Sequence, residues 1–197
     1  MEKGHQPMST ILRGVTQWQY WTVALGLCVW LMAPQAVVGT VFYAKDEALH
    51  IAFSEGVEVS EKTVVLSSDQ REAIEQMSQA KVSSGLFHFF EGKRNGEVTG
   101  YAAIDSRVMR TNLAVYMVVL SKTLAVEKVV LLAFNEPSEY QPTDAWLKHL
   151  EGNQPIDEIA PGQGVPPIAG STLSVHGLSD GVRVVRASFE VALQGAQ

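Results

Sequence analysis

The short links between four apolar stretches constrain the fold of this chain more than any other feature. The stretches are residues 83–91, 98–105, 114–120 and 125–134. Asn95-Gly96 separates the first two and is typical of a two-residue hairpin turn, and Ser121-Lys122-Thr123 supplies another reversal. Parallel strands would need long helical crossovers between them. The sequence therefore predicts an antiparallel sheet of about four or more strands, with the middle strands buried on both faces.

Helical patterns lie on both sides of this strand run. Residues 45–53 form a short amphipathic pattern, residues 57–66 are expected to be extended, and Ser67-Ser68-Asp69 opens a helix over 70–80. Thr143 or Asp144 can cap a short helix that contains Trp146. In the last segment apolar residues recur at helical spacing: Val175, Leu178, Val182, Val185, Phe189 and Ala192. The expected class is α+β, an antiparallel sheet with flanking helices.

Charge and cysteine content exclude several kinds of partner and site. The chain has 197 residues, 46% of them hydrophobic, which is enough for one domain with a core. Its net charge is −6 and its basic residues are scattered, so a nucleic-acid partner is not expected. Cys28 is the only cysteine and lies in an apolar N-terminal segment, so thiol-based metal or haem sites are excluded from the folded part. A redox role would need an organic cofactor or a histidine-bound metal.

The N-terminal region has the pattern of a membrane-entry signal. Residues 22–38 contain no charge and follow a polar segment that carries Lys3 and Arg13. The run fits either a signal peptide or an uncleaved transmembrane anchor, and both place the rest of the chain in the periplasm or another extracytoplasmic space. We therefore divide the chain into a signal or anchor region (1–39), a helix and strand extension (40–82) and a main domain (83–197).

A turn rich in small residues precedes the last helix. It reads Gly170-Ser171-Thr172-Leu173-Ser174 and follows Pro166 and Pro167. The first N–H groups of a helix are unpaired and its N-terminus is positive, so a phosphate is favoured there. A neighbouring hydroxyl is placed to carry that phosphate covalently. The simpler alternative is that Thr172 or Ser174 only caps the helix.

This turn resembles the Ser/Thr-Gly-Ala-Thr-x-Ser turn of the FMN-binding domain family, which includes peripheral subunits of sodium-pumping NADH:quinone reductase and Rnf-type complexes. The resemblance implies that Thr172 carries FMN through a phosphoester made by a flavin transferase that uses FAD, and that Gly170, Ser171, Leu173 and Ser174 complete the site. Three positions differ: the chain has Pro166 where the family has aspartate, Ala169 where it has serine or threonine, and Ser171 where it has alanine.

The likeness extends over residues 83–192, through a valine-rich hairpin, a loop with glutamate and a short aromatic helix. On that basis Glu136, Tyr140 and Trp146 are candidate neighbours of the isoalloxazine ring, although each also suits a purely structural role in the loop. The resemblance implies an electron carrier and not a stand-alone catalyst. Its partners would be the flavin transferase and a membrane or haem-containing electron-transfer protein.

Two other functions remain open at this point. The differences at Pro166, Ala169 and Ser171 favour a flavin-free accessory or assembly protein that uses the same domain to bind a membrane redox complex. A hydrolase or ligand-binding module with Ser171 or Ser174 as nucleophile is less favoured, because the sequence shows no histidine–acid pair arranged with either serine.

Overall fold

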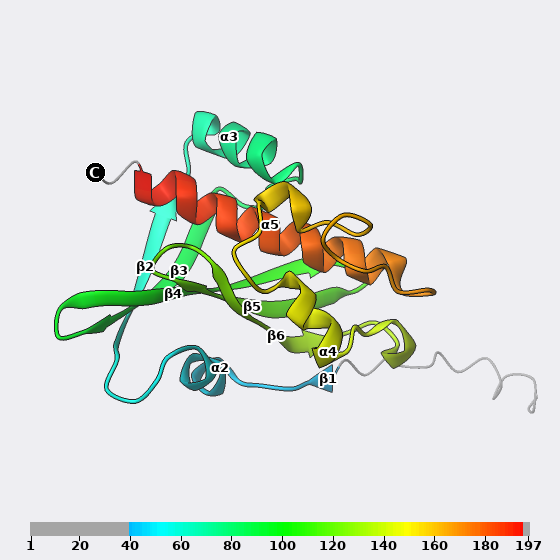
Figure 1. Cartoon of the computed structure of the whole chain (residues 1–197), viewed down its shortest axis with the longest axis horizontal. Helices are drawn as coiled ribbons and strands as arrows, with labels where there is room; N and C mark the ends of the chain where they lie inside the picture. Colours follow the sequence, from blue (N-terminus) through cyan, green and yellow to red (C-terminus); the bar gives the residue numbers. More distant parts are fainter. Residues whose placement is uncertain (1–39, 195–197) are drawn as a thin grey trace, which may run out of the picture. The chain divides into compact units, whose positions relative to one another are not determined.

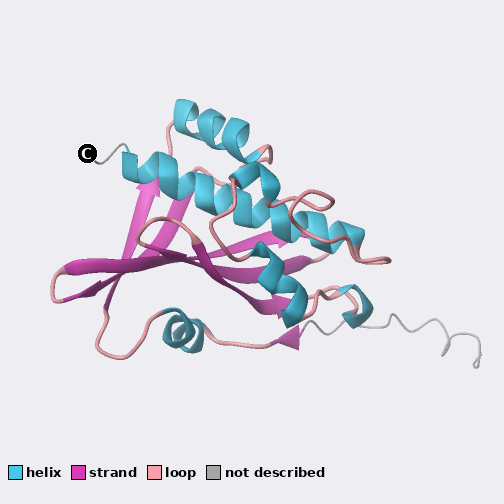
Figure 2. Ribbon diagram, in the orientation of Figure 1, coloured by secondary structure: helices cyan, strands magenta, loops and turns pink. Residues whose placement is uncertain are grey.

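The computed structural model describes residues 40–194 and shows a six-stranded antiparallel sheet with helices on both faces (Figures 1 and 2). The strand order is β1-β6-β5-β4-β3-β2. The bounds are β1 Thr40–Val41, β2 Glu58–Val65, β3 Leu86–Arg94, β4 Glu97–Val108, β5 Leu113–Ser121 and β6 Val126–Phe134. The α+β class and the antiparallel meander are thus confirmed. The predicted signal or anchor segment and Cys28 lie outside the described residues.

Helices α3 and α4 begin at the hydroxyl caps expected from the sequence. Their bounds are α2 Lys45–Ala52, α3 Ser68–Ser78, α4 Asp144–Leu147 and α5 Thr172–Gln194, with short 3-10 turns η1 Ser138–Tyr140, η2 Lys148–Leu150 and η3 Ile156–Glu158. Ser67 Oγ accepts the N–H of Gln70 (3.1 Å), and Gln70 Oε1 accepts the N–H of Ser67 (2.9 Å). Thr143 Oγ1 accepts the N–H of Trp146 (3.2 Å). Within residues 40–194, no helix combines the length and the apolar character that crossing a membrane requires.

Helix α5 covers one face of the sheet and buries the apolar stripe expected from its sequence. Phe189 is fully buried and lies edge-on to Phe87 and Phe89, with ring centroids 4.9 and 5.0 Å away. Burying side chains of this size contributes about 1.5–3 kcal/mol each. Helix α3 lies alongside α5 on this same face (Figure 1). A hydrogen bond from Arg186 Nη1 to Gln154 O (2.5 Å) links the loop that follows η2 to α5.

Helix α2 covers part of the opposite face. A second buried cluster joins it to the centre of the sheet through Ala48, Phe53, Phe90, Ala102 and Met117. Because side chains alternate along a strand, β5 contributes to both clusters and is buried on both faces, as expected for a middle strand.

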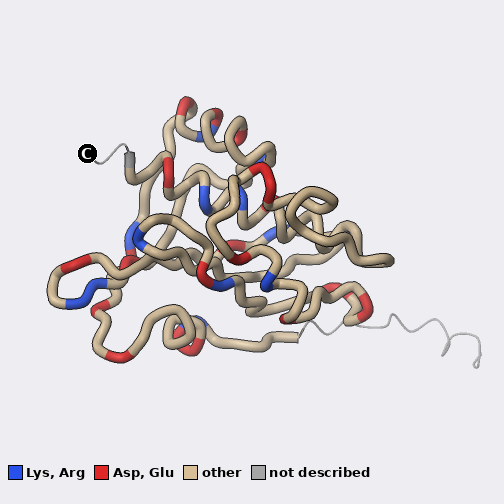
Figure 3. Tube along the Cα trace, viewed as in Figure 1, with Lys and Arg blue, Asp and Glu red and all other residues tan. Residues whose placement is uncertain are grey.

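The sheet begins and ends with strands from the first part of the described chain. β2 pairs with β3 along its whole length and occupies one edge. Charges of both signs are interspersed along the trace (Figure 3), and β2 itself carries Glu58, Glu61 and Lys62. Such charges discourage pairing of an exposed edge with another chain.

At the other edge, β1 is short. Thr40 lies opposite Phe134 and Val41 opposite Ala133, and the next two N–H groups, of Phe42 and Tyr43, both donate to Leu132 O (2.8 and 3.3 Å). The sequence did not indicate this strand, because two residues are too few for a periodic pattern.

Candidate functional site

The turn before α5 has a well-defined backbone. The N–H of Ser171 donates to Ile168 O (3.2 Å), and Gly170 lies between them with φ +84°. A residue with positive φ at this position of a turn is normally glycine, because a Cβ would be strained there. Ser171 O then accepts the first helical hydrogen bond, from Val175 N (3.0 Å). The glycine therefore sets the direction in which α5 leaves the turn.

The first turn of α5 has unpaired donors. Among the described residues, the N–H groups of Thr172, Leu173 and Ser174 meet no hydrogen-bond acceptor. Within residues 40–194 none of these N–H groups donates to the Ser171 hydroxyl, which itself donates to Glu139 O (3.3 Å). The Thr172 side chain is exposed at the first residue of the helix. An exposed hydroxyl thus stands beside free donors at a positive helix end, which suits a phosphate group.

Ser174 is the second hydroxyl of the turn that remains unpaired. Its side chain is fully buried, and its Oγ has no hydrogen-bond partner in the described part of the chain. A buried hydroxyl without a partner costs about 1–3 kcal/mol. Such a group in a helix normally bonds a carbonyl one turn earlier, and Ser179 Oγ, further along α5, is likewise without a partner among the described residues.

The loop between β6 and η2 lies against this turn. Glu139 O accepts from Ser171, which brings the neighbouring half-buried Tyr140 to the start of α5. Trp146 is buried and its Nε1 donates to Pro166 O (2.8 Å). The structure thus brings the loop of Tyr140 and Trp146 together with the threonine turn, through hydrogen bonds between residues 20 and 32 apart in sequence.

Glu136 holds a different part of the site. Its Oε1 accepts the N–H groups of Arg110, Thr111 and Asn112 at 2.9, 2.6 and 2.7 Å. Burial acts to raise the pKa of this carboxyl, but the three backbone donors outweigh it and lower the pKa to about 2. The Glu136 carboxylate therefore fixes the turn between β4 and β5 and is engaged by protein donors.

The turn between β4 and β5 carries Arg110, which the sequence analysis did not identify as a site residue. The Arg110 guanidinium carbon lies 4.0 Å from the centre of the Tyr140 ring. A cation over an aromatic face is held electrostatically. Met109, next to Arg110, packs against α5 at Gly177, where an added Cβ would lie 2.5 Å from the Met109 sulfur. An arginine in a strand-to-strand link is common, so only the long-range contact distinguishes this one.

The donor set of this site suits a phosphorylated ligand better than a metal. In residues 40–194, no group of three His, Cys, Asp or Glu side chains is arranged to hold a metal ion. Free N–H groups, an exposed hydroxyl and a nearby guanidinium fit an anion and a planar ring. The cavities beside β3 and beside α2 are not lined by residues of this turn.

No protein-family model matches the sequence, and no curated protein matches it either.

Proposed function

We propose that this chain is an exported or membrane-anchored flavoprotein that holds FMN covalently on Thr172 and passes electrons between redox partners. The observation that carries the proposal is the exposed Thr172 hydroxyl at the first residue of α5, beside three free N–H groups. The phosphoester would join Thr172 Oγ to the FMN phosphorus. The bond broken would be the pyrophosphate of FAD, with AMP as leaving group and the hydroxyl proton lost to solvent.

The residues around Thr172 have separable tasks in this proposal. The N–H groups of Thr172, Leu173 and Ser174 would bind phosphate oxygens, because a helix N-terminus favours negative charge. Arg110 and Tyr140 offer a cation and an aromatic ring on the adjoining surface. When bound, FMN would supply the redox chemistry, while the protein would supply position and tune the potential. A covalent tether would keep the cofactor from being lost outside the cytoplasm.

The proposal is tested by the mass of the protein. The full chain is co-expressed with a flavin transferase, purified, and examined by intact mass and by its visible spectrum after denaturation. We expect the mass of FMN less one water, and a flavin spectrum that stays with the denatured chain. Thr172→Ala should remove both signals completely.

Matched controls use the other hydroxyls of the turn. Ser171→Ala and Ser174→Ala should retain the added mass, because neither oxygen forms the proposed bond. An unmodified, colourless wild type would overturn the proposal, as would an added mass that persists in Thr172→Ala.

A second candidate, favoured by specific residues, is a flavin-free accessory protein that binds a membrane redox complex. Pro166 and Ala169 replace the acid and the hydroxyl that the resemblance would supply, and the Ser171 hydroxyl is engaged by Glu139 O. An unmodified chain that co-purifies with membrane redox subunits would support this candidate.

A further inference from the structure

The sheet divides between β3 and β4. The two strands pair from Arg94 opposite Glu97 to Phe90 opposite Ala102, and the pairing stops there. β3 continues to Leu86 in register with β2, and β4 continues to Val108 in register with β5. Figure 1 shows β2 and β3 rising away from β4 beyond this point. The described part of the sheet therefore contains two facing strand edges in its interior.

The direction of the backbone groups on these edges follows from the hairpin. Asn95 and Gly96 both have positive φ, as in a two-residue turn whose flanking residues, Arg94 and Glu97, exchange two hydrogen bonds. Alternation along β3 then turns the N–H and C=O of Phe90 and His88 toward β4. Leu86 follows the same alternation. Its N–H does not bond β2 and donates instead to Ser84 Oγ (3.0 Å).

The same alternation along β4 places the N–H and C=O groups of Ile104 opposite those of His88. Ala102 pairs with Phe90, so Ile104, two residues further along β4, also faces β3. Met109 N donates to Asn112 O across the β4–β5 turn, which confirms that odd-numbered residues at this end of β4 face β5. His88 and Ile104 thus present backbone donors and acceptors to the divide without pairing to each other. His88 is exposed and Ile104 is half-buried, so these backbone groups are accessible from solvent.

A cavity of about 170 Å³ fills the divide. Phe87 and His88 line one wall, and Ala103 to Asp105 line the other. Val184 and Val185 of α5 form an apolar floor. A dry cavity of about 150 Å³ accepts a ligand the size of benzene. The space therefore suits one medium-sized apolar side chain between two edges that offer backbone hydrogen bonds.

Each wall of the cavity makes its own contacts with the rest of the domain. Phe87 packs on Phe189 beneath β3, whereas Asp105 of β4 accepts the hydroxyl of buried Tyr116 on β5 (2.7 Å). Glu91 forms ion pairs with Lys62 (2.8 Å) and Lys93 (3.1 Å), which joins β2 and β3 into one wall. Each wall is thus fixed by neighbours on its own side of the divide.

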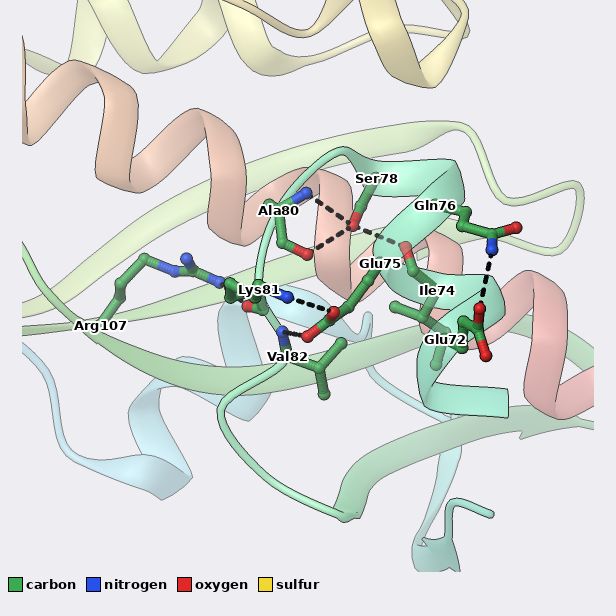
Figure 4. Close-up of polar contacts among 9 residues, drawn as sticks. All are labelled: Glu72, Ile74, Glu75, Gln76, Ser78, Ala80, Lys81, Val82 and Arg107. Atoms are coloured by element: carbon green, nitrogen blue, oxygen red, sulfur yellow. Dashed lines mark hydrogen bonds and ion pairs between the residues drawn. The ribbon is translucent and has the colours of Figure 1, made fainter. Parts of the chain in front are cut away.

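The segment between α3 and β3 lies along one side of this cavity. Figure 4 shows Glu75 accepting from Lys81 Nζ (2.8 Å) and from Val82 N (3.0 Å), while Arg107 of β4 donates to Lys81 O (3.1 Å). Val82, Ser83 and Ser84 line the mouth of the cavity. The segment therefore reaches from β3 to β4, and the cavity that it lines stays unfilled.

We propose that this divide is a binding site for a short extended peptide segment of a partner protein. The peptide backbone would bond His88 on one side and Ile104 on the other, and one apolar side chain would rest on Val184 and Val185. Recognition through main-chain groups with one side-chain pocket is how sheet edges bind extended peptides. The proposal is independent of FMN and of Thr172.

Hydrogen–deuterium exchange on the purified full chain tests the free site first. We expect the amides of His88 and Ile104 to exchange on the order of a hundred-fold faster than those of Phe90 and Ala102, because only the latter are paired. Equal protection of the four amides would mean that the divide closes in solution and would overturn the proposal. Thr172→Ala should give the same pattern, so this proposal and the flavin proposal fail separately.

A model peptide tests the ligand. The acetylated, amidated pentapeptide Ser-Val-Leu-Val-Ser should slow exchange at His88 and Ile104. Its analogue with an N-methylated leucine should bind about three- to ten-fold more weakly, which is the loss expected for one hydrogen bond. Val184→Phe should abolish binding by filling the floor, whereas Val191→Phe, on α5 but outside the cavity, should bind normally. The proposal is overturned if the peptide protects neither amide, or if N-methylation or Val184→Phe has no effect.

Discussion

Glu136 illustrates how one buried carboxylate can hold a turn in place. Its pKa of about 2 lies below the ordinary value of 4.5, so the carboxylate form stabilises the folded chain. This contribution is complete above pH 4.5 and is lost as the pH falls from 4.5 toward 2. The three N–H groups it accepts would otherwise be unpaired at the end of the β4–β5 hairpin.

We expect Glu136→Gln to lower the free energy of unfolding at pH 7 by about 1–3 kcal/mol, because charged acceptors are replaced by a neutral amide. The variant should also lose most of the stability change between pH 4.5 and 2. Urea unfolding at several pH values measures both effects. Glu139→Gln, at an exposed neighbouring position, is the control and should behave like the wild type. A Glu136→Gln chain with an unchanged pH dependence would contradict the assignment.

Gly181 shows a close approach between α5 and the sheet. A Cβ at this position would overlap the hydroxyl of Tyr116 and lie 2.5 Å from its Cζ. Tyr116 is fully buried and bonded to Asp105, so it has little freedom to move. Gly181→Ala should therefore destabilise the fold by about 1–3 kcal/mol, although alanine normally favours a helix.

Thermal or urea unfolding checks this expectation. The matched control is Gly85→Ala, since an added Cβ there meets no atom within 4 Å. If Gly181→Ala were as stable as Gly85→Ala, the close packing of α5 on Tyr116 would be wrong.

Among the helices, α3 and α2 differ in the hydrogen bonds at their first residues. α3 has a complete reciprocal cap between Ser67 and Gln70. α2 has only half of one: Glu47 accepts the N–H of Ala44 (2.9 Å), while Ala44 has no side-chain oxygen to accept in return.

Exchanging these caps should move stability in opposite directions. Ser67→Ala should cost about 0.5–2 kcal/mol, and Ala44→Ser should gain several tenths to about 1 kcal/mol, both measured by urea unfolding. Ser68→Ala, one residue inside α3, is the control and should have a much smaller effect. Loss of stability in Ala44→Ser would show that α2 does not begin at this residue.

The elements themselves were largely predictable from the chain. The meander, the hairpin at Asn95-Gly96 and the stripe of α5 follow from local periodicity and turn chemistry. Some boundaries shifted: β3 begins at Leu86 and not at residue 83, because Ser84 Oγ takes the Leu86 N–H and ends the preceding loop. Helix α3 stops at Ser78, since Gln79 adopts positive φ and turns the chain.

At the scale of the whole molecule, prediction fails where contacts depend on register between distant segments. The position of Thr172 at a helix start was evident from sequence, but the approach of Arg110 to Tyr140 requires the β4–β5 turn to meet a loop thirty residues later. The end of the β3–β4 pairing at Phe90 and Ala102 is likewise a matter of register, and neither strand carries a local signal for it. Sequence reasoning located the candidate attachment point, and tertiary structure supplied its surroundings.

The two-residue strand β1 determines how the domain responds to tension on the preceding chain. A pull at Thr40 is carried by the short β1–β6 pairing and by the two bonds to Leu132 O. We expect these few hydrogen bonds to break in sequence while the longer pairing of strands β3 to β6 stays intact. We therefore expect a pull on Thr40 to detach β1 from β6 before it strains the core.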